Sequence, residues 1–148
     1  MKRVVVACIA TLLALPAYAV DIALSSAWMR PADPGEAASA YVDIRSDAPL
    51  QLVGASTPLA RKVEIVVVER TDGTDPGKVV KVLAVPAGAP LRLAYKGSHL
   101  RLVGVKKPLV NGTPVPVTLR FRDKAGKRYT AVADVQVHGL VHVPGGVN

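Results

Sequence analysis

The chain has 148 residues, a length that suits one domain, and half of its residues are hydrophobic while only 4% are aromatic. The formal net charge of +8 favours acidic partners or anionic membrane surfaces, although a basic surface kept for solubility is an equally good explanation. Nucleic acid is a poor candidate for a partner because few aromatic side chains are available for base stacking.

The N-terminus has the pattern of a secretory signal peptide. Lys2 and Arg3 precede an apolar run over residues 4–15, and a small-residue cleavage motif follows at 17–19. The apolar run is shorter than the roughly 18 residues that a membrane-spanning helix needs, so we expect no stable membrane anchor. We therefore predict a signal peptide over residues 1–19, export to the bacterial periplasm and a mature chain of about 129 residues.

Cys8 is the only cysteine and lies inside this apolar run, away from the cleavage motif. We therefore expect neither lipid attachment nor a disulfide in the mature protein. The mature domain must be held together by its hydrophobic core, and a chain of this length can bury roughly two thirds of the surface that it exposes when unfolded.

Short β-branched segments separated by turn residues dominate the rest of the chain. We count about nine candidate strands and no sustained helical period. In the clearest strand, residues 115–122, four apolar side chains alternate with Pro, Thr and Arg, and Ala40, Val42 and Ile44 repeat the alternation. The pattern predicts a single all-β domain, a sandwich or barrel, over residues 20–137, followed by a loose tail at 138–148.

Two local motifs are best explained as turns. Residues 73–80 read GTDPGKVV, which is one residue short of a phosphate-binding loop and has no Ser or Thr after the lysine. Asn111-Gly112-Thr113 fits a glycosylation sequon, but Asn-Gly between two strands is typical of a tight turn.

The three histidines show no catalytic arrangement. His99, His138 and His142 have no visible nucleophile or paired carboxylate near them in the sequence, so we predict that the protein is not an enzyme. His138 and His142 would point the same way on a continued strand and could form a weak metal-binding pair, but two solvated histidines on a tail fit better. His99, with Arg101 and Val103 on its face of a strand, is by itself an ordinary surface histidine.

Seven segments resemble the periplasmic copper chaperones of the PCu(A)C type, and the similarity extends over about residues 27–137. They are AWMR (27–30), SAYVDI (39–44), LVGASTP (52–58), RKVEI (61–65), VPAG (85–88), SHLRLVGVKKPL (98–109) and VPVTLRF (115–121). The resemblance implies a cupredoxin-like β-sandwich, and a role in handling copper or delivering it toward respiratory oxidase assembly, with an oxidase-assembly or other copper-handling protein as partner.

The resemblance also implies a ligand pattern for copper(I): a His, ten residues, a Met, twenty-one residues, and His-x-Met. Imidazole and thioether groups are the ligand types that select copper(I). Without a gap, the pattern falls on Val66, Gly77, His99 and Arg101, so only His99 retains a coordinating side chain. The arginine is permanently charged and should repel a cation beside His99. Met29 is the only methionine left after the signal peptide.

Two functions follow from this reduced pattern. In the first, the protein still handles copper, with His99 helped by Met29, His138 or His142, or with copper held between two chains. In the second, favoured by the residues, the copper site is degenerate and the protein is a non-metal binding module. That module would present a surface formed by Val66, Val68, His99, Arg101 and Val103.

Overall fold

The computed structural model describes residues 19–139. Residues 1–18 of the predicted signal peptide, with Cys8, and residues 140–148 of the predicted tail, with His142, lie outside the described residues. Ten strands are present, one more than the count of about nine, and residues 19–139 contain no helix. The strands are β1 (Ile22–Met29), β2 (Ala37–Ser46), β3 (Leu50–Ser56), β4 (Ala60–Val67), β5 (Lys78–Val80), β6 (Leu83–Val85), β7 (Leu91–Leu93), β8 (His99–Val105), β9 (Pro114–Arg122) and β10 (Arg128–Val137).

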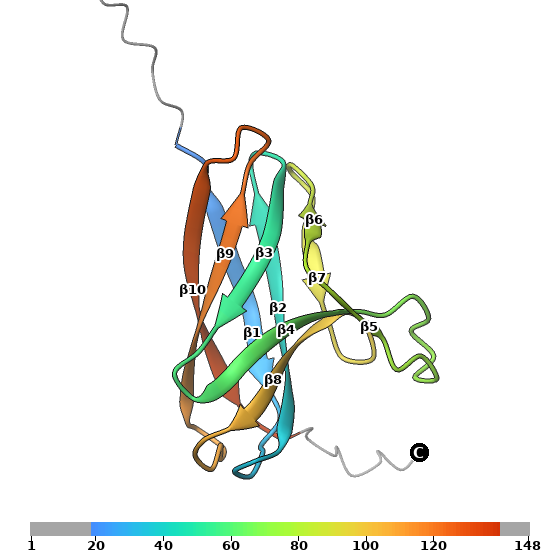
Figure 1. Cartoon of the computed structure of the whole chain (residues 1–148), viewed down its shortest axis with the longest axis vertical. Coiled ribbons are helices and arrows are strands. Elements are labelled where there is room, and N and C mark those ends of the chain that lie inside the picture. Colours follow the sequence, from blue (N-terminus) through green and yellow to red (C-terminus); the bar gives the residue numbers. More distant parts are fainter. Residues whose placement is uncertain (1–18, 140–148) are drawn as a thin grey trace, which may run out of the picture.

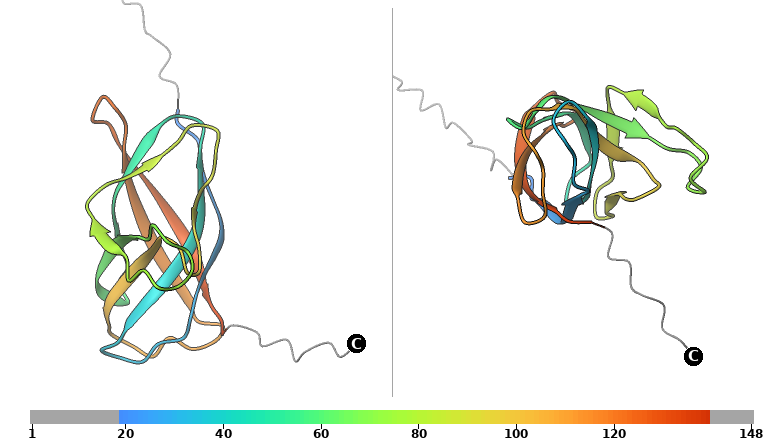
Figure 2. Two further views of the ribbon diagram at one scale, coloured as in Figure 1. Left: turned by 90° about the vertical axis from the view of Figure 1, so that its right-hand side faces the viewer. Right: turned by 90° about the horizontal axis from the view of Figure 1, so that it is seen from below.

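The seven longer strands form one barrel-like sheet. They are paired in the order β4-β8-β2-β1-β10-β9-β3, and a contact of Ala55 on β3 with Val63 on β4 closes the ring. All pairs are antiparallel except β1 with β10. The short strands β5, β6 and β7 extend the sheet beside β4, β3 and β2, and the connection between β4 and β5 projects to one side (Figures 1 and 2). The prediction of an all-β fold is therefore confirmed.

The interior is filled by apolar side chains from strands in which apolar and polar residues alternate. Val115, Val117, Leu119 and Phe121 on β9 are all 0% exposed, as the alternation predicts. Ala40, Val42 and Ile44 on β2 are also buried in this core. Burial of each large side chain contributes about 1.5–3 kcal/mol to folding, so the core accounts for the stability of a domain without a disulfide.

A β-bulge in β1 changes which side chains face the core. Ile22 and Leu24 pack against the interior, but the pairing with β2 shifts register between Ser25 and Trp28, and Ser26 has a φ of 52°. The extra residue inverts the alternation, so that Met29 becomes fully buried in the core. Trp28 consequently lies on the outer surface of the sheet, where it contacts other aromatic rings.

The two motifs interpreted as turns are turns in the structure. Residues 73–80 belong to the hairpin that joins β4 to β5, in which the Asp75 carboxylate accepts hydrogen bonds from the amides of Glu69, Arg70 and Gly77. Asn111-Gly112 connects β8 to β9, and Gly112 has a φ of 85°.

Candidate functional site

The register between β4 and β8 places three of the four copper-pattern positions on one outer surface. Val66 lies opposite His99, and Glu64 lies opposite Arg101. Side chains two apart on a strand share a face, so Val66 and Glu64 of β4 lie beside His99 and Arg101 of β8. The inward-facing residues between them on β8 are the buried Leu100 and Leu102.

The fourth position, Gly77, is also brought to this surface. It directly precedes β5 and has a φ of 78°. A Cβ atom added there would lie 2.5 Å from Cγ1 of Val66 and 3.1 Å from Cγ2 of Val68. The fold thus gathers all four positions, 66, 77, 99 and 101, although the coordinating side chains are absent from three of them.

Val66 is not exposed, contrary to the expectation of a surface rich in exposed valines. It is 0% exposed but is not part of the main core, and the backbone at Gly77 lies directly against its side chain. Val68 and Val103 are half-buried. The hydrophobic area that this surface offers to a partner is therefore smaller than the sequence suggests.

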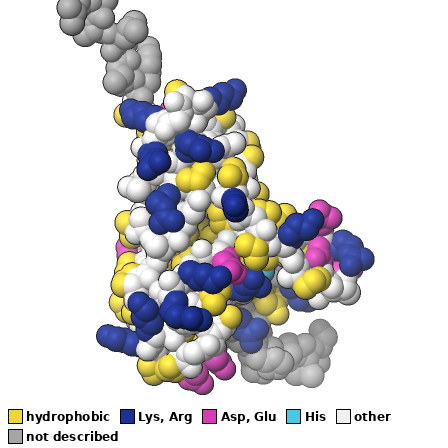
Figure 3. All heavy atoms as spheres, in the orientation of Figure 1, with side chains coloured by type: hydrophobic (Ala, Val, Ile, Leu, Met, Phe, Trp, Pro, Cys, Tyr) yellow, Lys and Arg dark blue, Asp and Glu magenta, His cyan; other side chains and the backbone are white. Residues whose placement is uncertain are grey.

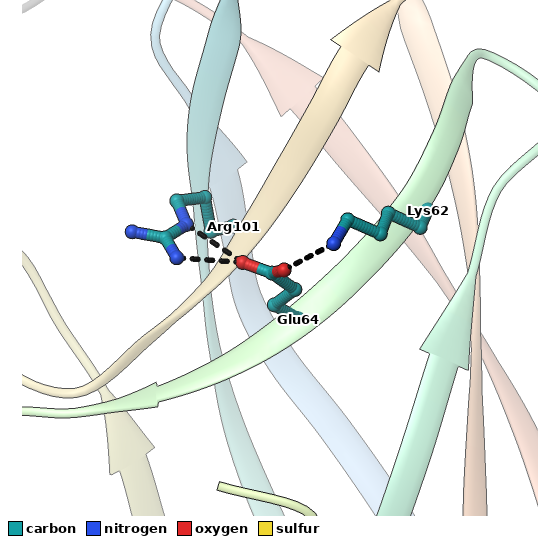
Figure 4. Close-up of polar contacts among 3 residues, drawn as sticks. All are labelled: Lys62, Glu64 and Arg101. Carbon is teal, nitrogen blue, oxygen red and sulfur yellow. Dashed lines mark hydrogen bonds and ion pairs between the residues drawn. The ribbon is translucent and has the colours of Figure 1, made fainter. Parts of the chain in front are cut away.

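Arg101 points toward Glu64 and forms a hydrogen-bonded ion pair with it (Figure 4). Its Nε and Nη2 atoms donate to the same Glu64 oxygen, Oε2, at 3.0 and 2.6 Å, and Lys62 Nζ lies 2.6 Å from Oε1. The hydrogen bond from Lys62 and then that from Arg101 lower the pKa of Glu64 below its ordinary value. Two cations and one carboxylate thus stand beside His99, and the guanidinium is fixed there by its partner.

His99 is half-buried and has one ring nitrogen committed. Its Nδ1 lies 2.9 Å from the carbonyl oxygen of Gly97. A carbonyl can only accept, so Nδ1 carries the hydrogen and donates it, and Nε2 is the nitrogen that bears the lone pair in the neutral ring. This arrangement resembles the way in which a backbone carbonyl orients a metal-binding imidazole, but a single nitrogen is all that it supplies.

A row of rings that sequence reasoning did not single out extends from His99 across β2 and β1. The Tyr41 ring lies 6.3 Å from His99, 6.1 Å from Tyr95 and 4.6 Å from Trp28, as centroid distances. Trp28 stacks at 4.8 Å on His138. Tyr41 is 5% exposed although it faces away from the core, and this burial raises the pKa of its hydroxyl. The sequence did not indicate the burial of Tyr41, because it lies between the core residues Ala40 and Val42 and the alternation along the strand predicts a solvent-exposed side chain there.

The proposed helper ligands do not meet His99. Met29 is buried in the core, and His138, assigned to the tail, lies on the far side of Trp28 and Tyr41. The His138 amide donates to the carbonyl of Met29 at 3.0 Å, which continues the pairing of β10 with β1. His142 is outside the described residues. Between residues 19 and 139, no three His, Cys, Asp or Glu side chains are grouped closely enough to hold a metal ion. Among the four pattern positions, His99 alone has a side chain of a type that coordinates copper(I).

Comparisons with known proteins identify the relatives of this chain. The model of a family described as "Putative lipoprotein LpqE-like" matches residues 22–144. A curated protein of Leifsonia xyli subsp. xyli (strain CTCB07), "Putative lipoprotein Lxx21020", is 33% identical over 105 residues, which are 69% of this chain and 63% of that protein. The chain therefore spans less than two thirds of the length of this relative.

Similar solved structures are PCuAC domains. The apo PCuAC domain from PmoF1 is 25% identical with a TM-score of 0.63, over 83% of this chain and 98% of that one. The copper-bound PCuAC domain from PmoF2 is also 25% identical, with a TM-score of 0.60 over 82% and 97%. The solution structure of CuI-DR1885 from Deinococcus radiodurans is 31% identical, with a TM-score of 0.55 over 86% and 83%. These likenesses confirm the resemblance to the PCu(A)C type. No helix within residues 19–139 has the length and apolar character to cross a membrane.

Proposed function

This chain belongs to the LpqE-like family, and we propose that it is an exported, non-enzymatic PCuAC-type protein whose former copper surface now serves as a binding module. The observation that carries the proposal is the convergence of positions 66, 77, 99 and 101 in space with a single metal-binding side chain among them. In this proposal the backbone scaffold of the copper site is retained, whereas a valine, a glycine and an arginine occupy three of its four ligand positions.

The chemistry of the three replacements argues against tight copper binding. Copper(I) is held by soft thioether and thiolate ligands together with imidazole, and His99 supplies one imidazole nitrogen only. The guanidinium of Arg101 is always charged and is held by Glu64 on the same surface, where it opposes the approach of a cation. Val66 and Gly77 pack against each other in the remaining space.

The same surface has the composition of a small protein-binding site. Tyr, Trp and Arg are the residues that carry most binding energy at interfaces, and all three occur here in Tyr95, Trp28 and Arg101. Tyr95 is 43% exposed, and the buried Tyr41 supports it from below. We propose that the partner is another protein of the cell envelope, of the copper-handling or oxidase-assembly kind that the family suggests.

Copper handling with added ligands is the second candidate function. Copper-bound structures exist for two relatives, the PmoF2 domain and DR1885, and this supports it. His99 would then be the one ligand from this surface, and the remaining ligands would come from His138 or His142 after a rearrangement, or from a second chain. Met29 would have to leave the core to take part.

We also propose a cellular location and a more specific type of β-fold for this chain. The lipoprotein names of the family and of the curated relative support export to the cell envelope. Together with the signal peptide proposed for residues 1–19, they favour the periplasm. The TM-score of 0.63 to a PCuAC domain supports the interpretation of the barrel-like sheet as a cupredoxin-like sandwich over residues 20–137, with a tail at 138–148.

Titration of the purified protein with copper(I) against a competing chelator tests the proposal. We expect the wild type to bind copper(I) no more strongly than a single surface histidine does. In the His99→Ala variant, this weak binding should either disappear or stay at the same weak level. Tight binding with one copper per chain, lost in His99→Ala, would establish the second candidate function instead. A titration at several protein concentrations separates a site within one chain from a site shared by two chains, because only the latter strengthens with concentration.

A further inference from the structure

A second basic surface lies on the far end of the sheet from the histidines, over β9 and β10. Arg122 on β9 is directly opposite Arg128 on β10, and Arg120 precedes Arg122 by two residues on the same outer face. Like charges directly opposite each other on paired strands are destabilising. Figure 3 shows Lys and Arg side chains gathered over the part of the molecule where Figure 1 places β3 and β9, with few acidic groups between them.

Neutral partners hold two of these arginines in place without neutralising them. Arg122 Nη2 donates to the side-chain oxygen of Gln51 at 3.1 Å, and Arg120 Nη1 donates to the Ser56 hydroxyl at 3.3 Å. Arg120 also lies over Gly54, where an added Cβ would collide with the guanidinium. Both ion pairs found within residues 19–139 involve Glu64 on another part of the sheet, so these arginines keep their charge and most of their donors.

The one carboxylate in the neighbouring hairpin is already used. Asp123 Oδ1 accepts the amides of Ala125 and Lys127, both at 2.9 Å, and Oδ2 accepts the hydroxyl of Tyr129 at 3.1 Å. These bonds shape the turn between β9 and β10. Asp123 therefore stabilises the hairpin and leaves the adjacent arginines without an acidic partner.

A cavity of about 190 Å³ opens between the arginines. Its lining includes the three arginines 120, 122 and 128 together with Val53, Tyr129 and Thr130. A larger cavity of about 580 Å³ adjoins it, shares Arg122 and adds Asp123 and Lys124. Guanidinium groups that line one cavity can bind a tetrahedral oxyanion through paired hydrogen bonds, and Arg120 and Arg122 line this one while also donating to Ser56 and Gln51 of β3.

We propose that the cavity formed by Arg120, Arg122 and Arg128 binds a phosphate-type oxyanion, either as a free phosphate or as the phosphodiester of a phospholipid headgroup. The bound anion would lie beside the directly opposed cations Arg122 and Arg128 and would offset the repulsion between them. The site is separate from the His99 surface, so it does not depend on the function proposed above.

Two binding measurements separate the sources of the anion. Amide chemical shifts of the ¹⁵N-labelled protein are followed during titration with inorganic phosphate and with pyrophosphate, and cosedimentation is measured with vesicles of phosphatidylglycerol or phosphatidylcholine. Arg122→Gln and Arg128→Gln should each weaken binding about tenfold or more, since each removes a charge-assisted contact. Lys107→Gln, an exposed position in the β8–β9 connection, removes the same charge elsewhere and should leave binding unchanged.

Each outcome decides the proposal. Shifts around Arg122 and Arg128 with free phosphate, lost in the arginine variants, establish a soluble anion as ligand. Binding to phosphatidylglycerol vesicles alone, lost in the same variants, establishes the lipid headgroup. Absence of both, or an equal loss in Lys107→Gln, overturns the site and leaves a general effect of net charge. Without phosphate, Arg128→Gln should not lower Tm; a lower Tm would show that the arginine stabilises the fold by itself and would also overturn the argument.

Discussion

Arg101 on β8 and Glu64 on β4 face each other across paired strands, with two guanidinium nitrogens on one carboxylate oxygen at 3.0 and 2.6 Å. The pair occupies the place beside His99 where the PCu(A)C pattern requires a thioether. Lys62 completes the group from the next outward-facing position of β4. This surface is therefore organised around a carboxylate held by two cations, and its physical behaviour should follow from that group.

Glu64 should make the stability of the protein depend on pH in the acid range. Its pKa is lowered in the folded state, chiefly by the Lys62 and Arg101 hydrogen bonds. Its contribution is therefore fully present above the unfolded pKa of about 4.3 and is lost as the pH falls through the lower folded value. We expect Glu64→Gln to lower Tm at pH 7 and to differ less from the wild type below that range. The measurement is thermal unfolding of both proteins across pH 2–7.

Glu69→Gln is the matched control, because it removes one exposed carboxylate that forms no ion pair within the described residues. A Glu64→Gln variant that tracks the wild type at every pH would show that the three-residue group contributes nothing measurable. Exposed ion pairs contribute only about 0–1 kcal/mol in general.

Arg101→Met should restore part of the copper site. Position 101 lies two residues from His99 on the same face of β8, about 6.5 to 7 Å away along the backbone, which is within chelating reach. The change supplies a soft ligand and removes a positive charge. We expect copper(I) affinity to rise about tenfold or more over the wild type, measured by chelator competition. Arg45→Met, on the exposed side of β2, makes the same change at a distance and should have no such effect.

Strand positions and turns were largely predictable, because alternation along β2, β8 and β9 and the Gly and Asn turn residues are local signals. The burial of Met29 in the core was not predictable. Its burial follows from the bulge at Ser26, which shifts the alternation within β1, and the sequence around it contains no glycine to mark that change. The sheet closes through Ala55 and Val63, one registered pair between the consecutive strands β3 and β4, and the local pattern of residues does not indicate that this pair closes a ring.

The positions of the ligand pattern could be named from the sequence, whereas their contacts could not. The ligand spacing names 66, 77, 99 and 101, and the fold brings these four positions to one surface. The burial of Val66 depends on the path of the backbone at Gly77, and the direction of Arg101 depends on Glu64, thirty-seven residues away. Contacts between side chains this distant in sequence follow from strand register, which one chain alone does not reveal.

Gly77→Ala should destabilise the protein more than other glycine substitutions in turns. Gly77 has a φ of 78°, and the new Cβ would lie 2.5 Å from Val66 Cγ1. Gly112→Ala is the control, with a φ of 85° and nothing within 4 Å of the added atom. We expect the free energy of unfolding to fall by about 1 to 2 kcal/mol in Gly112→Ala from backbone strain, and by about 1 to 3 kcal/mol more in Gly77→Ala from the clash.

Chemical denaturation of the two variants measures the difference. Equal losses would mean that Val66 and its neighbours move aside without cost. The contact that destabilises Gly77→Ala also bears on the copper pattern, because the Cβ of a methionine at position 77 would collide with Val66 in the same way. Restoration of the pattern at 77 should therefore succeed only when Val66 is replaced as well, which makes the two positions non-additive in unfolding free energy.

His138→Ala should change the environment of Trp28, the only tryptophan of the chain. The His138 ring stacks on the indole at 4.8 Å with an angle of 14° between the planes, so its removal opens one face of the indole to water. We expect the emission maximum of the folded protein to move to longer wavelength, and the free energy of unfolding to fall by about 0.5 to 1.5 kcal/mol. His99→Ala is the control, because His99 contacts Tyr41 at 6.3 Å and has no ring contact with Trp28 among the described residues. The same shift in both variants, or in neither, would show that the stacked pair does not persist in solution, and would return His138 to the solvated tail that the sequence predicts.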